Sequence, residues 1–201
     1  FKSEPYIFSL MLLLVVLIQK SELVAAKTIF PENFSLAFIG VTLTMLFLMP
    51  LNMLFSVPAA TLLSRVGGDI DKLWLVVDRL FVVAVIGSFF IAVSGFILYE
   101  YFFDFLYSEI PTFLSNIEAG IFIFISGVGL LSSRLILKVA SLNRCLAYLA
   151  LTSVMLILSL SISYKSLAGM LLATVSIKAF FLVIFLYLER SRYKNKFEQL
   201  C

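Results

Sequence analysis

Charged and amide side chains that lie inside long apolar runs are the residues of this sequence most able to do chemistry. Lysine and arginine together number 15 and aspartate and glutamate 12 among 201 residues, of which 62% are hydrophobic. An ionised group at the bilayer centre costs about 2.5–3.5 kcal/mol on insertion scales, so each one requires a reason. The candidates for a substrate or ion cavity are Lys178, Lys27, Lys20, Glu22, Asn52 and Glu118.

Lys178 is the clearest of these candidates. It follows the start of the last apolar run by about 12 residues, which is about 18 Å along a helix and close to the bilayer centre. A lysine near a helix end can extend its ammonium group to the membrane surface, but from this depth neither surface is within easy reach. We therefore expect Lys178 to face a cavity or an internal partner.

Three charged residues, Lys20, Glu22 and Lys27, interrupt the first apolar run. With about 3.6 residues per helical turn, Lys20 and Lys27 share a face, whereas Glu22 points well away from it. Two interpretations remain open. Either the helix is frayed or broken here and the charges contact lipid headgroups, or a discontinuous helix lines a water-filled passage, where irregular or charged backbone is tolerated at depth.

Simpler explanations compete for Glu118, Asn52 and two nearby prolines. Glu118 lies near the N-terminus of a predicted helix, where the helix dipole stabilises a carboxylate. Pro50 and Pro58 flank Asn52 within one apolar run. Because proline frees a backbone carbonyl and permits bending, both are candidate hinges, although kinks that merely assist packing are about as common.

The elements that must position these residues are membrane-spanning helices, each of which needs about 20 mostly apolar residues. We predict an all-α polytopic membrane protein, a six-transmembrane-helix bundle that forms one transmembrane domain over residues 1–201. Within this range, the last predicted helix is followed by a basic cytoplasmic tail at residues 189–201. The predicted helices cover residues 6–30, 34–63, 73–103, 110–139, 142–164 and 167–188.

The first helix is the least certain of the six, because its uninterrupted run from Tyr6 to Ile18 is short for a span. A signal peptide is the alternative, but the run has no basic leader and no small-residue cleavage site. With six helices and both termini cytoplasmic, most of the 15 basic residues lie on the cytoplasmic side. The connection from Tyr99 to Glu109 is acidic and aromatic, so the distribution follows the positive-inside rule of a multi-pass protein in the cytoplasmic (inner) cell membrane.

Several functions are excluded by what the sequence lacks. It contains no histidine, which removes Ser-His and Cys-His hydrolases, histidine proton relays and most haem and zinc sites. Cys145 and Cys201 show no spacing typical of metal ligands, and no phosphate-binding loop is present. We expect no enzymatic activity, no metal and no cofactor, and a net charge of +3 is too small to indicate a nucleic-acid partner.

Two segments resemble polysaccharide-export flippases of the multidrug/oligosaccharidyl-lipid/polysaccharide exporter superfamily. Residues 21–40, S-E-L-V-A-A-K-T-I-F-P-E-N-F-S-L-A-F-I-G, resemble the junction between the first and second helices of a half. The family has an acidic residue late in a helix, a basic residue about five positions later and a proline turn, which Glu22, Lys27 and Pro31 match. Met49 to Arg65 is similar to the proline-bearing helix of the family.

This resemblance implies one half of a twelve-helix exporter-type fold, and the chain resembles the C-terminal half. The implied function is transport of a lipid-linked oligosaccharide or polysaccharide precursor across the membrane by alternating access. Lys178, Lys27 and Lys20 would contact the anionic headgroup, and Glu22 would pair with one of them or bind a coupling cation. The implied partners are the lipid bilayer, the anionic lipid-linked saccharide, and a missing N-terminal half or another copy.

Two alternatives remain open at this point. A multidrug/cation antiporter of the same superfamily would favour an apolar cavity with buried carboxylates and few lysines. A non-transporting scaffold of envelope assembly would have no need of Lys178.

Overall fold

The chain is helical almost throughout in the computed structural model, which describes residues 4–65, 70–106 and 114–198. No strand occurs within those ranges, so the predicted all-α class is confirmed. A short 3₁₀ helix, η1 (Pro31–Asn33), follows the second α-helix. The α-helices are α1 (Glu4–Gln19), α2 (Ser21–Ile29), α3 (Phe34–Arg65), α4 (Ile70–Leu106), α5 (Asn116–Val139), α6 (Leu142–Ser159) and α7 (Leu167–Glu198).

Five of these helices, α3 to α7, contain segments long and apolar enough to cross a membrane. The helices α1 and α2 add up to one further span if the pair is counted together, but they are bent by 58° across the break at Lys20. These helices indicate a multi-pass membrane protein. The first apolar run is therefore a broken helix, which is compatible with both interpretations of its charges.

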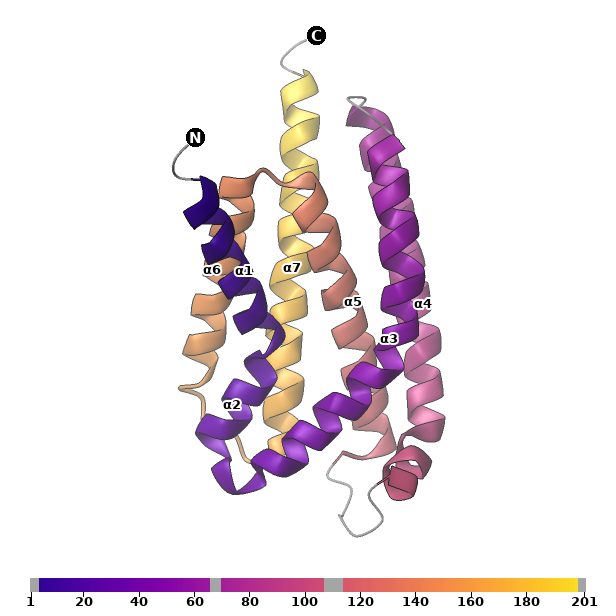
Figure 1. Cartoon of the computed structure of the whole chain (residues 1–201), viewed down its shortest axis with the longest axis vertical. Helices are drawn as coiled ribbons and strands as arrows, with labels where there is room; N and C mark the ends of the chain where they lie inside the picture. Colours follow the sequence, from indigo (N-terminus) through magenta and orange to yellow (C-terminus); the bar gives the residue numbers. More distant parts are fainter. Residues whose placement is uncertain (1–3, 66–69, 107–113, 199–201) are drawn as a thin grey trace.

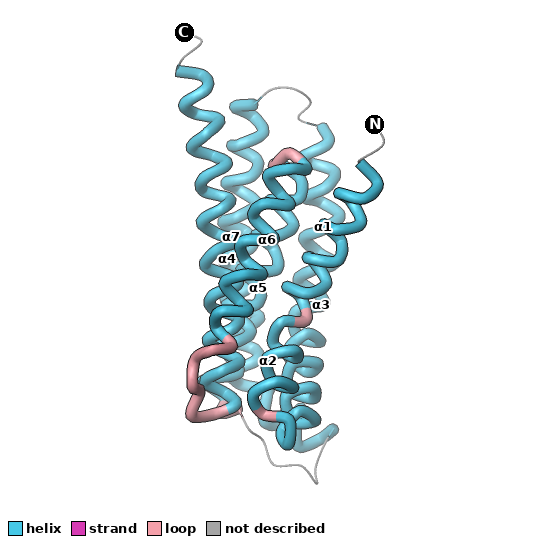
Figure 2. The backbone as a smooth tube through the Cα atoms, turned by 90° about the vertical axis from the view of Figure 1, so that its left-hand side faces the viewer, coloured by secondary structure: helices cyan, strands magenta, loops and turns pink. Residues whose placement is uncertain are grey.

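The helices stand side by side, with both chain termini at the same end of the molecule (Figure 1). We call this the terminal end; the α5–α6 connection also lies there, whereas the α2–α3 and α6–α7 connections lie at the opposite end (Figures 1 and 2). The most extensive contacts join α4 to α5, α5 to α7 and α1 to α6. The helix α7 thus occupies the middle of the molecule, between the α1–α6 pair and α5.

Glycines let α5 approach its neighbours closely. A Cβ atom at Gly127 would lie 2.5 Å from the hydroxyl oxygen of Ser88 in α4. A Cβ atom at Gly129 would lie 3.2 Å from the Cβ atom of Ala179 in α7. Small residues at such contacts are how membrane helices gain packing energy, since the lipid supplies no hydrophobic drive between helices.

The helix α5 begins at Asn116, later than the predicted start at residue 110; residues 110–113 lie outside the described ranges. Ser115 is its N-cap, with the Ser115 hydroxyl accepting from Glu118 N at 3.3 Å and Glu118 Oε2 accepting from Ser115 N at 2.8 Å. This reciprocal capping box satisfies two backbone donors and fixes the start of the helix. Glu118 therefore has a structural role at the helix start.

The helix α6 ends at Ser159, short of the predicted residue 164. The Ser159 hydroxyl donates to the carbonyl of Leu156 at 2.6 Å. After it, Ser161 N and Ile162 N bond to carbonyls three residues earlier, at 3.1 Å each. Serine side chains compete with the helical hydrogen-bond pattern, and the tighter turn they accompany ends the helix.

The helix α7 continues to Glu198, so residues 189–198 extend the last helix, where a separate tail was predicted. Glu189 is fully buried, and the Tyr193 ring packs on Trp74 of α4 with ring centroids 5.6 Å apart. Tertiary contacts beyond the apolar run thus hold the chain in helical form.

Candidate binding cavity

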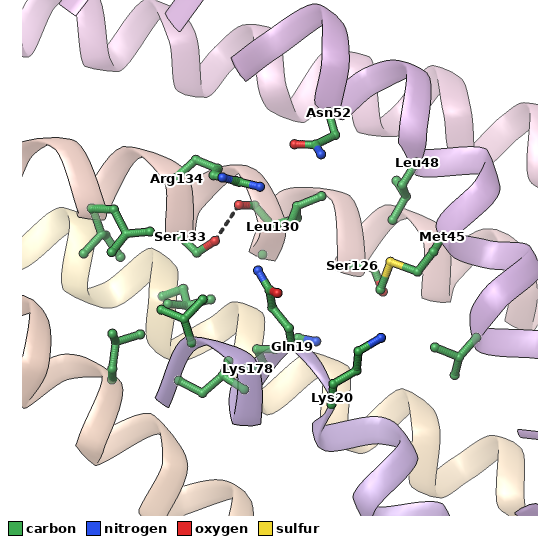
Figure 3. A pocket seen from close by; sticks show the side chains of 18 of the residues that line it. Gln19, Lys20, Met45, Leu48, Asn52, Ser126, Leu130, Ser133, Arg134 and Lys178 are labelled. Carbon is green, nitrogen blue, oxygen red and sulfur yellow. Dashed lines mark hydrogen bonds between the residues drawn. The ribbon is translucent and has the colours of Figure 1, made fainter. Parts of the chain in front are cut away.

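A cavity of about 420 Å³ lies among α1, α3, α5, α6 and α7 (Figure 3). Apolar side chains form most of its wall. Polar or charged side chains come from every one of these helices and from the α1–α2 break. They are Gln19, Lys20, Thr42, Asn52, Ser126, Ser133, Arg134, Tyr148 and Lys178.

Lys20 reaches the cavity because it lies in the break between α1 and α2. Its backbone carbonyl still accepts from Leu23 N at 3.1 Å and Val24 N at 3.0 Å, so the chain remains hydrogen-bonded across the bend. Figure 3 shows Gln19 and Lys20 on one side of the cavity, with Asn52 and Arg134 across from them. The break therefore places a cation at the cavity wall.

Glu22 and Lys178 form an ion pair that links α2 to α7. The Lys178 ammonium group donates to Glu22 Oε1, across 156 positions in the sequence. Glu22 is 0% exposed and Lys178 is 7% exposed, so the pair is shielded from solvent. Lys178 thus has the internal partner that its depth predicts, and of the two residues Lys178 alone contributes to the cavity wall.

The carboxylate of Glu22 has little other support. The Ser21 hydroxyl lies 3.4 Å from Glu22 Oε2 and also donates to the carbonyl of Ile18 at 2.8 Å. The second contact is the shorter, so Lys178 provides most of the stabilisation of this buried charge. A buried ion that depends on one partner is sensitive to anything that draws that partner away.

The cavity wall carries a net positive charge. No aspartate or glutamate is among the residues that line it. Within the described ranges, no carboxylate pairs with Lys20 or Arg134, whereas the charge of Lys178 is offset by Glu22. Lys20 and Arg134 are both exposed, so water screens their attraction for a ligand, but the sign of their charge favours an anionic ligand.

Buried apolar clusters border the cavity on more than one side: of its wall residues, one cluster contains Ile18, Ile136, Cys145, Tyr148, Leu149 and Leu182, and another contains Val41. The cavity wall includes Leu137 near the end of α5 and Cys145 near the start of α6, where the two helices connect. The cluster that contains Val41 lies toward the opposite end, near the α2–α3 and α6–α7 connections. Its members are Ala25, Ala26, Ala37, Val41, Phe122, Leu167, Met170, Leu171 and Val175.

The remaining predicted residues fall in different places. Asn52 lines the cavity from α3, while Lys27 is exposed on α2 and Glu118 lies in the α5 capping box, both outside the residues that line the cavity. The helix α3 stays helical through Pro50 and Pro58, and Figure 1 shows it changing direction partway along. The hinge role of the prolines remains a prediction.

A second buried carboxylate, Glu189, was not singled out from the sequence. It is 0% exposed, and Tyr148 OH donates to its Oε1 at 2.5 Å. Arg144 Nε lies 3.2 Å and an Arg192 terminal nitrogen 3.5 Å from the same oxygen. The Tyr148 ring, part of the cavity wall, stacks on Phe185 with centroids 4.4 Å apart, so this network fixes the wall between α6 and α7.

A scan against protein-family models found no match, and neither did searches of curated proteins and solved structures. The likeness to polysaccharide-export flippases therefore depends on the matched residues of the chain. The function is inferred from the cavity and its charges.

Proposed function

We propose that this chain is part of a transporter that moves a lipid-linked saccharide precursor across the cytoplasmic cell membrane. The observation that carries this proposal is a cationic cavity with mainly apolar walls. Lys20 and Arg134 would bind the anionic headgroup, which phosphate or pyrophosphate would supply. The apolar wall would tolerate the part of the ligand nearest the lipid.

The charge at the two ends supports an orientation with both termini in the cytoplasm. The helix ends at the terminal end (Figure 1) carry the basic residues Arg65, Arg134, Lys138, Arg144, Arg190 and Arg192 with Asp78 and Glu189, whereas the opposite end carries Glu32, Glu100 and Asp104 with Lys27 and Lys165. Basic residues are retained on the cytoplasmic side of membrane proteins.

Alternating access requires a cavity that is closed on one side and elements that can reopen it on the other. The resemblance to exporters provides a second six-helix half, or a second copy, that would rock against this one. Bending of α3 at Pro50 and Pro58 would contribute to such a movement. The chain is then one half of a twelve-helix transporter.

A cation antiporter fits the cavity less well. Such a transporter needs a carboxylate that can hold its cargo, but the cavity wall contains none, and Glu22 already pairs with Lys178. The positive wall would also repel a cationic drug. The charges of the cavity wall therefore favour an anionic substrate over a cationic one.

A transport assay tests the proposal directly. In proteoliposomes, the Lys20→Ala/Arg134→Ala variant of the full protein should move a lipid-linked saccharide at least about tenfold more slowly, as expected for one lost charge contact or more. Lys138→Ala is the matched control, because Lys138 is an exposed cation on α5 that does not line the cavity. Normal transport by the double variant at normal expression would contradict the proposal.

A further inference from the structure

We infer that Glu22 is an internal counter-ion that an anionic ligand displaces from Lys178, so that ligand binding loosens α2 from α7. This inference rests on the proposed function in one respect, namely that the cavity takes an anion. It assigns to Glu22 an autoinhibitory role that is separate from direct contact with the ligand.

The position of Lys178 is the first argument. Its ammonium group donates to Glu22, yet its side chain also lines the cavity, and no other charged residue belongs to both sites. The ammonium group of Lys178 has three N–H donors but one positive charge, so a ligand anion that reaches it weakens the hold of Lys178 on Glu22 and repels the Glu22 carboxylate. Lys20 and Arg134 strengthen the ligand side of this competition, because both line the same cavity.

The position of Glu22 along the chain is the second argument. It lies just after the break at Lys20, in a helix that spans only Ser21–Ile29 and is bent by 58° from α1. In the described ranges its ion pair is the one charged contact between α2 and α7; the others include the small side chains of Ala25 and Ala26. Opening the pair would leave α2 joined to α7 by apolar packing alone.

The two arguments combine into a coupling mechanism. A ligand held by Lys20 and Lys178 contacts two places at once. Lys20 forms the break between α1 and α2, and Lys178 holds α2 through its ion pair with Glu22. A ligand shifts a conformational equilibrium by its differential affinity for the two states, and this one binds better where the Glu22–Lys178 pair is open. Part of the binding free energy is then used to open the pair, which moderates affinity and permits release.

Binding measurements on charge variants test this inference. The probe is geranyl pyrophosphate, titrated by calorimetry into the purified protein in phosphatidylcholine nanodiscs. We expect Glu22→Gln to bind the probe about tenfold more tightly than the unmodified protein, and Lys178→Gln to bind it about tenfold more weakly. The charge-swapped Glu22→Lys/Lys178→Glu variant should keep an ion pair and the thermal midpoint but lose binding, because a carboxylate then faces the cavity.

Hydrogen exchange provides a readout that a merely structural ion pair would not change. The probe should accelerate backbone amide exchange in Ser21–Ile29 while leaving α5 unaffected, and Glu22→Gln should do the same without the probe. Weaker binding by Glu22→Gln, or slower exchange of α2 in the presence of the probe, would overturn the inference and leave the proposed function intact. Failure of the unmodified protein to bind the probe would overturn both.

Discussion

Among the residues that the structure describes, the two wholly buried carboxylates, Glu22 and Glu189, differ in how many groups support them. Each is 0% exposed. Glu189 accepts from Tyr148 and lies within 3.5 Å of two guanidinium groups. Glu22 depends on the ammonium group of Lys178, and within the described part of the chain a Ser21 hydroxyl at 3.4 Å is its remaining polar contact. Burial alone therefore does not distinguish a fixed anchor from an exchangeable one; the number of partners does.

Their surroundings differ in the same direction. The arginines around Glu189 are partly exposed, with Arg144 and Arg192 side chains 34% and 55% accessible, so water can solvate them if the network is disturbed. The Lys178 side chain is 9% accessible, and its partner is fully buried. Loss of one partner should therefore cost more at Glu22 than at Glu189.

The largest expected effect is that of Lys178→Met. This change leaves the Glu22 carboxylate buried without a counter-ion, which should lower the free energy of unfolding by about 3–5 kcal/mol. Unfolding of the purified protein in mixed detergent micelles, followed by circular dichroism, measures it. The double variant Glu22→Gln/Lys178→Met is the matched control and should recover most of the loss, since no charge remains buried.

A loss below about 1 kcal/mol for Lys178→Met would contradict the proposed difference between Glu22 and Glu189, because exposed ion pairs contribute stability in that range. It would mean that Glu22 finds another partner or reaches water. Failure of the double variant to recover stability would instead assign the loss to packing around the lysine stem.

The second effect is that of Glu189→Gln. The amide oxygen can still accept from Tyr148, and the partly exposed Arg144 and Arg192 can turn toward water. The expected loss is about 1.5–3 kcal/mol, the range of a hydrogen bond to a charged group. The same detergent unfolding measures it, and a loss greater than that of Lys178→Met would reverse the ranking of the two sites.

The sequence predicts the class of fold because composition alone determines it. A chain with 62% hydrophobic residues and so few charges cannot cover its surface in water, and its apolar runs are long enough for helices. The helix ends were predicted less well. The Ser115–Glu118 capping box is a local pattern that could have been recognised, whereas the extension of α7 depends on contacts with α4 and α6.

The sequence indicated residues of the candidate site but did not indicate which of them contact one another. Depth along a helix is a local quantity, so it indicates that Lys178 needs an internal partner. The choice of Glu22 depends on the register between α2 and α7, which sequence spacing does not provide. Glu189 was missed because it directly follows an apolar run, and hydropathy assigns such a residue to water; its burial comes from Tyr148, 41 positions earlier.

A smaller effect is expected from Tyr148→Phe. The substitution removes the hydroxyl that donates to Glu189 and keeps the ring stacked on Phe185. Because Arg144 and Arg192 remain near the same carboxylate oxygen, the loss should fall below the range of a hydrogen bond to a charged group, at about 1 kcal/mol. A second readout is the rate at which maleimide modifies Cys145, a buried thiol in the same cavity wall, in a Cys201→Ser background. We expect a faster reaction as the wall loosens; an unchanged rate would show that the stacked rings suffice to hold it.

The smallest effect concerns an ion pair of the opposite kind. Arg190 and Asp78 are 2.6 Å apart, which is shorter than either guanidinium contact of Glu189, but their side chains are 55% and 41% accessible. Water already solvates both charges, so neither is stranded when the other is removed. A double-mutant cycle with Asp78→Asn and Arg190→Gln should give a coupling of about 0.2–1 kcal/mol that falls as salt is raised.

The Asp78–Arg190 pair tests the comparison because its charged groups are close together but exposed to solvent. If separation determined the strength of an ion pair, the Asp78–Arg190 coupling would exceed the loss caused by Glu189→Gln. If burial and the number of remaining partners determine it, the order is Lys178→Met, then Glu189→Gln, then the exposed pair. A coupling above about 2 kcal/mol between Asp78 and Arg190 would contradict the second view. It would also contradict the reasoning that a bound anion has its largest structural effect at the buried Glu22–Lys178 pair.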